Sequence, residues 1–311
     1  MPTRDLDIAV IVPCYNEAVA IGKVVADLRA ALPQATVYVY DNNSSDGTSE
    51  VAAAAGALVR FEGRRGKGNV VRRAFADVDA DVYVLIDGDD TYDAAAAPAL
   101  VEALLDGPYD HVLGVRRETS ATAYRPGHAL GNRAFNALVG RLFGAPVSDM
   151  LSGYRAFSRR FVKSFPALSR EFEIETELTV HSMTLRVPQL EQEVGFRDRP
   201  AGSESKLRTY HDGLRILSLI TRLVRHERPL SFYGIVAAVF VVVALILGIP
   251  VFVDFLQTGL VPRLPTAVLA GVLMVVGLLS LATGLILDGV LRLRQEAARL
   301  SYLRFPAVGS R

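Results

Sequence analysis

Two uncharged stretches near the end of the 311-residue chain constrain its architecture more than any other feature. They run from Leu230 to Val253 and from Leu264 to Leu287. Each is longer than the roughly 20 apolar residues that a helix needs to cross a hydrocarbon core of about 30 Å. A pair of buried core helices is the alternative, but two such runs in tandem would need a very large soluble core. We therefore expect an integral membrane protein with two transmembrane helices within residues 230–290, at about 230–253 and 264–288.

The charges beside these stretches predict their orientation. Three arginines precede the first stretch, three follow the second, and one lies between them: Arg222, Arg225 and Arg228; Arg292, Arg294 and Arg299; and Arg263. Because Lys and Arg accumulate on cytoplasmic flanks, we expect residues 1–229, the basic tail 291–311 and both termini in the cytoplasm, at a membrane of the bacterial inner-membrane type. Residues 211–229 have the pattern of an amphipathic juxtamembrane helix. A helix packed on the preceding domain explains that pattern equally well.

Strand-like and helix-like patterns alternate in the first part of the chain. Apolar runs predict strands at 8–12, 36–40, 58–61, 82–86 and 111–115. Helical periodicity or capping residues predict helices at 17–32, from Ser45 to about Gly56, at 67–78 and at 94–105. This alternation predicts an α/β domain at 1–210, with a mostly parallel, Rossmann-like sheet covered by helices on both faces. Neither a dinucleotide-binding GxGxxG after the first strand nor a Walker A sequence occurs.

Polar residues gather where three of these strands end. They are Tyr15, Asn16 and Glu17 after the first; Asp41 and Asn42 after the second; and Asp87, Gly88, Asp89 and Asp90 after the fourth. Ligands of parallel sheets bind beyond the carboxyl ends of the strands, so we expect one site there. Carboxylates at this density suit Mg²⁺ or Mn²⁺. A solvated acidic turn is the alternative for the sequence DGDD taken alone.

Composition excludes several classes of protein. Apolar residues make up 50% and charged residues 22% of the chain, which is unlike a disordered protein. The single cysteine, Cys14, excludes an internal disulfide and a multi-cysteine metal site. The 34 Lys and Arg residues balance 33 Asp and Glu residues, so we expect no nucleic-acid partner.

Several motifs occur in an order that resembles a known family. The segments VPCYNE (12–17), DNNSSDGT (41–48), RGKGNVVRRAF (65–75) and DGDD (87–90) are similar to family 2 glycosyltransferases of the GT-A fold. SDMLSGYRAFSRRF (148–161) and GSESKL (202–207) resemble the group of dolichyl-phosphate mannose synthases and polyprenyl-phosphate glycosyltransferases, some of which carry two C-terminal transmembrane helices. Each motif alone is weak, but their order and spacing together are specific.

The resemblance implies roles on the donor side. It assigns nucleoside contacts to Pro13, Tyr15, Glu17 and Asp41, diphosphate contacts to Lys67, and the DxD motif to Asp87, Gly88 and Asp89. Asp87 and Asp89 would be the ligands of Mg²⁺ or Mn²⁺. Thr91 replaces a Gln that helps to hold the metal in relatives, which leaves the remaining ligand open, with Asp90 as one candidate.

On the acceptor side, the resemblance assigns the lipid phosphate to Arg116. The candidates that accompany it are His128, Asn132, Arg133, Ser205 and Lys206, and the choice between His128 and Arg133 stays open. Asp149 matches an active-site acid that would orient either a sugar hydroxyl or an acceptor-binding arginine. One of Glu173, Glu175 and Glu177 is a further candidate for sugar contact, although stabilisation of a helix N-terminus explains that cluster almost as well.

The reaction implied is an inverting transfer of a sugar from a nucleotide-sugar, UDP-hexose or UDP-N-acetylhexosamine, to a polyprenyl phosphate. A phosphate monoester is already anionic near neutral pH, so it needs positioning by cations more than it needs a base. GDP-mannose is the alternative donor. Motifs of processive polysaccharide synthases and nucleotidyltransferases are missing, and the complete set of acidic and basic motifs disfavours a catalytically inactive membrane-anchored scaffold. A homo-oligomer formed through the transmembrane helices stays open.

Overall fold

A computed structural model describes residues 6–118, 140, 148–167, 174–197, 221 and 224–308. Contacts divide the chain into two units, which are described separately. One comprises Met1–Arg208 with Ala297–Arg311, and the other comprises Thr209–Glu296. Six candidates from the sequence lie outside the described residues: His128, Asn132, Arg133, Glu173, Ser205 and Lys206. Most of the predicted juxtamembrane helix at 211–229 lies outside them as well.

The first unit is built on a seven-stranded sheet with the order β3-β2-β1-β4-β6-β5-β7. The strands are β1 (Ile8–Cys14), β2 (Thr36–Asp41), β3 (Leu58–Phe61), β4 (Val82–Leu85), β5 (His111–Glu118), β6 (Arg155–Ser158) and β7 (Gln189–Phe196). Only β6 runs antiparallel to its neighbours; the other neighbouring pairs are parallel. The first residue of β6, Arg155, therefore lies opposite Leu85 near the carboxyl end of β4. The residues before β6 thus reach the edge at which the parallel strands end.

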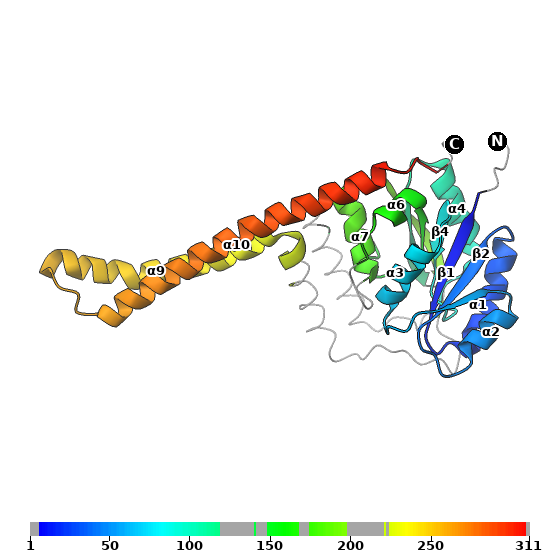
Figure 1. The fold of residues 1–311 in the computed structure, drawn as a ribbon, viewed down its shortest axis with the longest axis horizontal. Coiled ribbons are helices and arrows are strands. Elements are labelled where there is room, and N and C mark those ends of the chain that lie inside the picture. Colours follow the sequence, from blue (N-terminus) through cyan, green and yellow to red (C-terminus); the bar gives the residue numbers. More distant parts are fainter. Residues whose placement is uncertain are drawn as a thin grey trace. The chain divides into compact units, whose positions relative to one another are not determined.

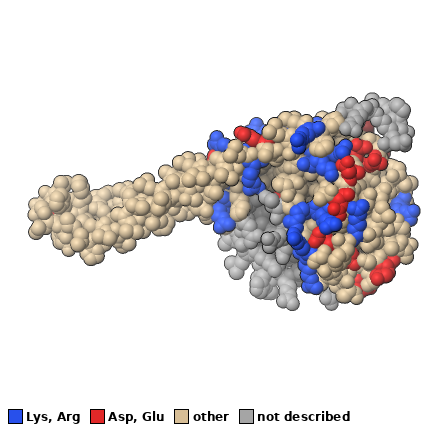
Figure 2. All heavy atoms as spheres, viewed as in Figure 1, with Lys and Arg blue, Asp and Glu red and all other residues tan. Residues whose placement is uncertain are grey.

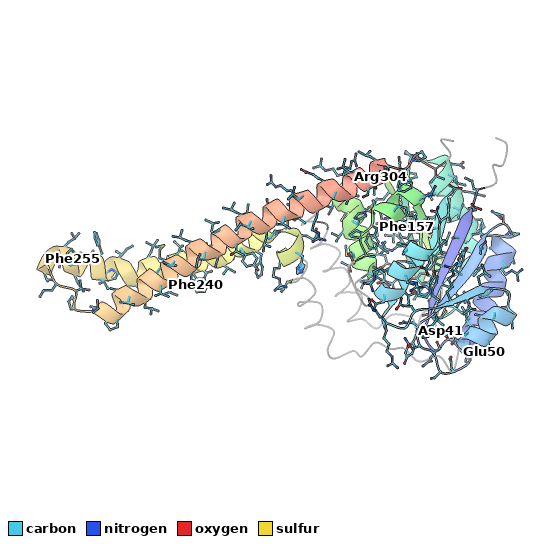
Figure 3. The ribbon with its side chains drawn as sticks, in the orientation of Figure 1. Asp41, Glu50, Phe157, Phe240, Phe255 and Arg304 are labelled. Carbon is cyan, nitrogen blue, oxygen red and sulfur yellow. The ribbon has the colours of Figure 1, made fainter. Side chains whose placement is uncertain are left out.

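Helices cover both faces of this sheet (Figure 1). They are α1 (Ala18–Ala31), α2 (Thr48–Ala54), α3 (Lys67–Asp77), η1 (Ala94–Ala96), α4 (Ala97–Asp106), α6 (Arg159–Ser164) and α7 (Ile174–Leu185). Successive residues of a strand point to opposite faces. Val10 and Val12 of β1 accordingly join a core with α1, α2 and α4, whereas Ala9 and Ile11 join a core with α3, α6 and α7. Phe157 is fully buried in the second core, where it stacks on Phe161 (Figure 3).

The C-terminal residues of the chain belong to this unit. The hydroxyl of Tyr302 donates a 2.6 Å hydrogen bond to Oδ2 of buried Asp110, and the same carboxylate receives two hydrogen bonds from the guanidinium of Arg160. Arg160 also lies over the Tyr302 ring, with its Cζ 4.7 Å from the ring centroid. The last residues are therefore packed as part of the α/β unit.

Two long helices, α9 (Pro229–Thr258) and α10 (Leu264–Leu303), contain the uncharged stretches. Both are long and apolar enough to cross a membrane, and only 17% of the most apolar window of each is buried in the structure. Figure 2 shows much of this part of the chain as a surface without charged residues, whereas Lys, Arg, Asp and Glu are interspersed on the α/β unit. Phe240 and Phe255 are labelled on α9 in Figure 3. Helix α10 continues without a break past residue 288, through the arginines that follow the second stretch.

Candidate functional site

The loops that follow β1 and β2 are joined by hydrogen bonds. The backbone N–H of Asn16 donates to Ser44 Oγ at 2.9 Å, and Ser45 N–H donates to Asn16 Oδ1 at 2.9 Å. Glu17, which is buried, donates its N–H to Thr48 Oγ1 at 2.9 Å. Asn16 has a positive φ of 55°, a conformation that asparagine tolerates better than most residues. The two loops therefore form one polar wall at the edge of the sheet.

The end of β2 also fixes the loop before α3. Asp41, at the end of β2 (Figure 3), is buried and accepts hydrogen bonds from Ser44 N–H and from the Ser49 hydroxyl. The next residue, Asn42, accepts from Gly66 N–H at 2.7 Å. Gly66 has a φ of 118°, which favours glycine. The backbone of the RGKG segment is thus held in place by the end of β2.

Lys67, the first residue of α3, lies between two carboxylates. Its Nζ is 2.5 Å from Asp87 Oδ1 and 2.5 Å from Glu175 Oε1. Burial alone would lower the pKa of Lys67, but the charges of Asp87 and Glu175 raise it above its ordinary value. The other oxygen of Glu175, Oε2, is buried and has no hydrogen-bond partner among the residues that the structure describes. Lys67 is therefore a fixed cation, and Glu175 keeps one acceptor atom for a further donor.

The DGDD turn places its members differently. Asp89 Oδ1 accepts hydrogen bonds from the Thr91 hydroxyl at 2.6 Å and from Thr91 N–H. Asp90 has a positive φ of 56° and pairs with Lys23 and with Arg197. These pairs make Asp90 a poor candidate for completing a metal shell. A Cβ on Gly88 would lie 2.5 Å from Cys14 Sγ, so only glycine fits between this turn and β1.

The electrostatic surroundings of Cys14 show that three strand ends converge. Burial raises the pKa of its thiol well above the ordinary value, and four carboxylates raise that pKa further. They are Glu17 after β1, Asp41 of β2, and Asp87 and Asp89 after β4. The site predicted from three separate strand ends is thus one cluster of negative charge.

Asp87 and Asp89 fit a divalent metal by the chemistry of their donor atoms. Among the described residues, no group of three or more His, Cys, Asp and Glu side chains is arranged to hold a metal ion. Magnesium is commonly held by one or two carboxylates together with substrate phosphates and water. Asp87 also lies beside the Lys67 ammonium, which suits a diphosphate, so a metal held by Asp87 and Asp89 together with substrate phosphates would match that pattern.

Arg116, near the end of β5, is held by Asp149 through a bidentate pair. Its Nε and Nη2 donate to the two carboxylate oxygens at 2.7 Å each. The Asp149 side chain is 7% exposed and that of Arg116 is 20% exposed, so the pair lies at the border of the interior. The guanidinium also lies over the ring of Phe196, at the end of β7, 5.3 Å from its centroid. Asp149 thus orients an arginine that still reaches solvent.

The turn at 149–153, between Asp149 and the start of β6, brings this pair close to Lys67. A Cβ on Gly153 would overlap Asp87 and would lie 2.9 Å from Lys67 Nζ. The N–H of Gly153 donates to the buried Tyr92 hydroxyl at 2.8 Å. One end of the turn therefore contacts Arg116, and the other contacts the pair of Lys67 and Asp87.

The structure gathers most of the described sequence candidates at one edge of the sheet. They are Pro13, Tyr15, Glu17, Asp41, Lys67, Asp87, Gly88, Asp89, Arg116 and Asp149. Glu175 is only one of three glutamates in the sequence FEIETEL, and Arg155 is one of several residues in the motif SDMLSGYRAFSRRF. The inward direction of Glu175 and the burial of Arg155 follow from the packing of α7 and β6.

Comparisons with known proteins identify the family of the chain. A model of the glycosyl transferase family 2 matches residues 9–165. The glycosyltransferase AglJ of Haloferax volcanii is 34% identical over 303 residues, 95% of this chain and 97% of that protein. The dolichyl-phosphate hexose transferase of the same organism is 31% identical over 222 residues, 71% of this chain and 96% of that protein.

A solved structure is similar in fold. Glucosyl-3-phosphoglycerate synthase from Mycobacterium tuberculosis, crystallised with Mn²⁺, UDP-glucose and phosphoglyceric acid, has a TM-score of 0.58 at 24% identity. The matched part covers 70% of this chain and 79% of that chain. The mixed sheet with carboxylates beyond its strand ends is that of a GT-A glycosyltransferase, as the sequence predicted. The chain belongs to glycosyl transferase family 2.

Proposed function

We propose that this chain is an inverting glycosyltransferase that moves a hexose or N-acetylhexosamine from a UDP-sugar to a polyprenyl phosphate. The observation that carries the proposal is that a single turn, at 149–153, contacts a cationic side chain at each of its ends. Arg116 is held at one end of the turn at 149–153, and Lys67 lies at the other. Two adjacent cations suit a reaction between two phosphate-bearing substrates. The relative named dolichyl-phosphate hexose transferase supports this type of acceptor.

On the donor side, we assign the nucleoside to Pro13, Tyr15, Glu17 and Asp41, in the wall formed by the loops after β1 and β2. Lys67 supplies positive charge to the diphosphate. Asp87 and Asp89 would hold Mg²⁺ or Mn²⁺, which stabilises negative charge on the departing diphosphate when it is bound. Glu175 Oε2 is the acceptor for a sugar hydroxyl, because a buried carboxylate oxygen without a partner is costly.

On the acceptor side, Arg116 binds and orients the lipid phosphate, and Asp149 fixes the orientation of the Arg116 guanidinium. We keep His128, Asn132, Arg133, Ser205 and Lys206 as further phosphate contacts. The phosphate oxygen forms a bond to the anomeric carbon while the bond from that carbon to the nucleoside diphosphate breaks. The attack comes from the opposite side of the leaving group, so an α-linked donor gives a β-linked product. The acceptor is already ionised, so no residue has to remove its proton.

We propose that α9 and α10 span a membrane of the bacterial inner-membrane type. The α/β domain at 1–210, the juxtamembrane segment at 211–229 and the tail at 291–311 then lie in the cytoplasm. The arginines before the uncharged stretch 230–253 and after the uncharged stretch 264–287 support this orientation. A polyprenyl phosphate keeps its tail in the bilayer and its phosphate at the interface, which an enzyme attached to that membrane can reach.

The test is a panel of donors offered to the full chain in detergent or nanodiscs. UDP-glucose, UDP-galactose, UDP-N-acetylglucosamine and GDP-mannose are each supplied with a ten-carbon polyprenyl phosphate and Mg²⁺ or Mn²⁺, and the lipid product is identified by mass spectrometry. We expect one UDP-sugar to give a glycosyl-phosphate lipid. Turnover only with GDP-mannose would identify the alternative donor. Transfer to water or to a sugar hydroxyl, with none to the lipid phosphate, would refute the proposed acceptor.

A further inference from the structure

Arg155, the first residue of β6, is a buried cation that contacts two carbonyl groups of the preceding turn. Its side chain is completely inaccessible to solvent. Nε donates to the carbonyl oxygen of Ser152 at 2.9 Å, and Nη2 donates to that of Met150 at 2.7 Å. Both carbonyls belong to the turn at 149–153. The planar fork of one arginine therefore fixes the course of this turn at two points.

The same guanidinium also binds α7. Its Nη1 donates to Thr179 Oγ1 at 2.8 Å, and the Thr179 hydroxyl donates to the backbone carbonyl of Glu175 at 3.1 Å. Glu175 is the second of the two carboxylates that hold Lys67, the other being Asp87. Arg155 thus connects the helix that positions Lys67 with the turn that positions Arg116.

The burial of this charge is costly, which favours a positioning role. Removing a guanidinium from water costs several kcal/mol, and an apolar side chain of similar volume at such a place is often neutral or stabilising. Burial lowers the pKa of Arg155 to about 10, so the group is still charged at neutral pH. Asp149 and Glu175, which favour its charged form, are the two carboxylates that hold Arg116 and Lys67.

We propose that Arg155 is a positioning residue. By fixing the turn at 149–153 against α7, it determines the position of Arg116, the ligand of the acceptor phosphate, relative to Lys67 on the donor side. The inference rests on the proposed function, because it takes Arg116 as the phosphate ligand. Arg155 itself has no access to a substrate, so it acts through the turn. Loosening this turn weakens acceptor binding and alignment while the fold persists.

The experiment compares Arg155→Lys with Arg160→Lys in the full chain. Arg160 is a matched control, because it lies five residues further along and its guanidinium also donates to two oxygens, those of Asp110. Each variant keeps its charge and loses the planar fork. Turnover is normalised to the amount of folded protein, which is determined by thermal unfolding. KM is measured separately for the sugar donor and for a ten-carbon polyprenyl phosphate. Calorimetric titration with that lipid phosphate gives its Kd without turnover.

We expect Arg155→Lys to raise the acceptor KM and Kd about fivefold and to lower kcat, with the donor KM changed less than twofold. Arg160→Lys should lower the melting temperature without changing either KM more than twofold. Equal effects of the two variants, or an unchanged acceptor KM and Kd in Arg155→Lys, would overturn the inference.

If Arg155→Lys does not fold, Thr179→Val removes one partner of the guanidinium and should still raise the acceptor KM more than Arg160→Lys does. If the wild-type protein transfers no sugar to lipid phosphate, the proposed function itself is refuted. If the wild-type protein transfers sugar normally and the two arginine variants behave alike, only the role of Arg155 is refuted.

Discussion

The donor side and the acceptor side of the site are held in different ways. The loops after β1 and β2 and the segment before Lys67 bind one another through hydrogen bonds to backbone N–H groups, made by Asn16, Asp41 and Asn42. Arg116 on the acceptor side depends on one carboxylate, Asp149, for its orientation. The loops of the donor side are therefore preorganised by hydrogen bonds to the backbone, whereas Arg116 on the acceptor side is oriented by a charge pair. Four substitutions or conditions test this difference.

The largest effect is expected for Asp89→Asn. Loss of a metal-binding carboxylate removes several kcal/mol of charge stabilisation, which corresponds to a decrease in kcat of about a thousandfold. Turnover is measured at saturating Mg²⁺ or Mn²⁺. The matched control is Asp93→Asn in the same loop, because Asp93 caps the following helical turn through a bond from Ala95 N–H. Substantial turnover by Asp89→Asn with an intact fold would contradict the metal role.

The second prediction concerns α7, on which the donor side depends through Glu175. Burial lowers the pKa of His181 from 6.5 to about 4. Between these pH values the unfolded chain binds a proton that the folded chain excludes, so the free energy of unfolding decreases as pH falls. The loss reaches about 3 kcal/mol at pH 4. Chemical unfolding between pH 7 and 4 should show a smaller loss of stability in His181→Gln than in the wild-type protein. Equal pH dependence in the two proteins would exclude His181 as the cause.

Third, Gly153→Ala should lower kcat about a hundredfold, because the new Cβ displaces Asp87 and Lys67 and a shift of about 1 Å can cost that much. Gly63→Ala is the control, since its Cβ would lie 3.5 Å from Phe61 Cε1, an ordinary contact. Steady-state kinetics and melting temperatures are compared for both variants. If the two alanines have the same small effect, the turn at 149–153 does not approach the donor side as closely as the structure indicates.

The smallest effect is expected for Arg116→Ala, which should raise the acceptor KM about tenfold and leave the donor KM nearly unchanged. A hydrogen bond to a charged group contributes about 1.5 kcal/mol or more. Arg117→Ala is the neighbouring control, because Arg117 is 75% exposed and pairs with Glu193. A rise in the donor KM instead of the acceptor KM would place the lipid phosphate elsewhere.

Local patterns sufficed to predict the first half of the α/β unit. The strand at 58–61 has the predicted ends, and the helix predicted at 67–78 spans Lys67–Asp77. These segments are short and have clear apolar runs or helical periodicity. The sequence did not reveal β6, which has the sequence RAFS, or β7, which has the sequence QLEQEVGF. Their pairing with β4 and β5 joins distant parts of the chain, which a local pattern does not encode.

The sequence likewise did not predict the directions in which the charged side chains point. On a helix, Glu173 and Glu177 share one face and Glu175 points away from it, but the pattern does not say which face meets the interior. Packing of α7 against the sheet turns Glu175 toward Lys67. Likewise, Arg116 and Asp149 are far apart in sequence, and the end of β5 and the start of β6 bring them together.

The sequence alone determined the family, the α/β class, the acidic edge of the sheet and the two long apolar helices, because ordered motifs and hydrophobic patterns are local properties of the chain. The tertiary structure decided which charges meet. It placed Lys67 between Asp87 and Glu175, directed Asp90 toward Lys23 and Arg197, and buried Arg155 behind the turn at 149–153. Charge pairing depends on distances of a few ångströms between residues far apart in sequence, and only the packed sheet fixes those distances.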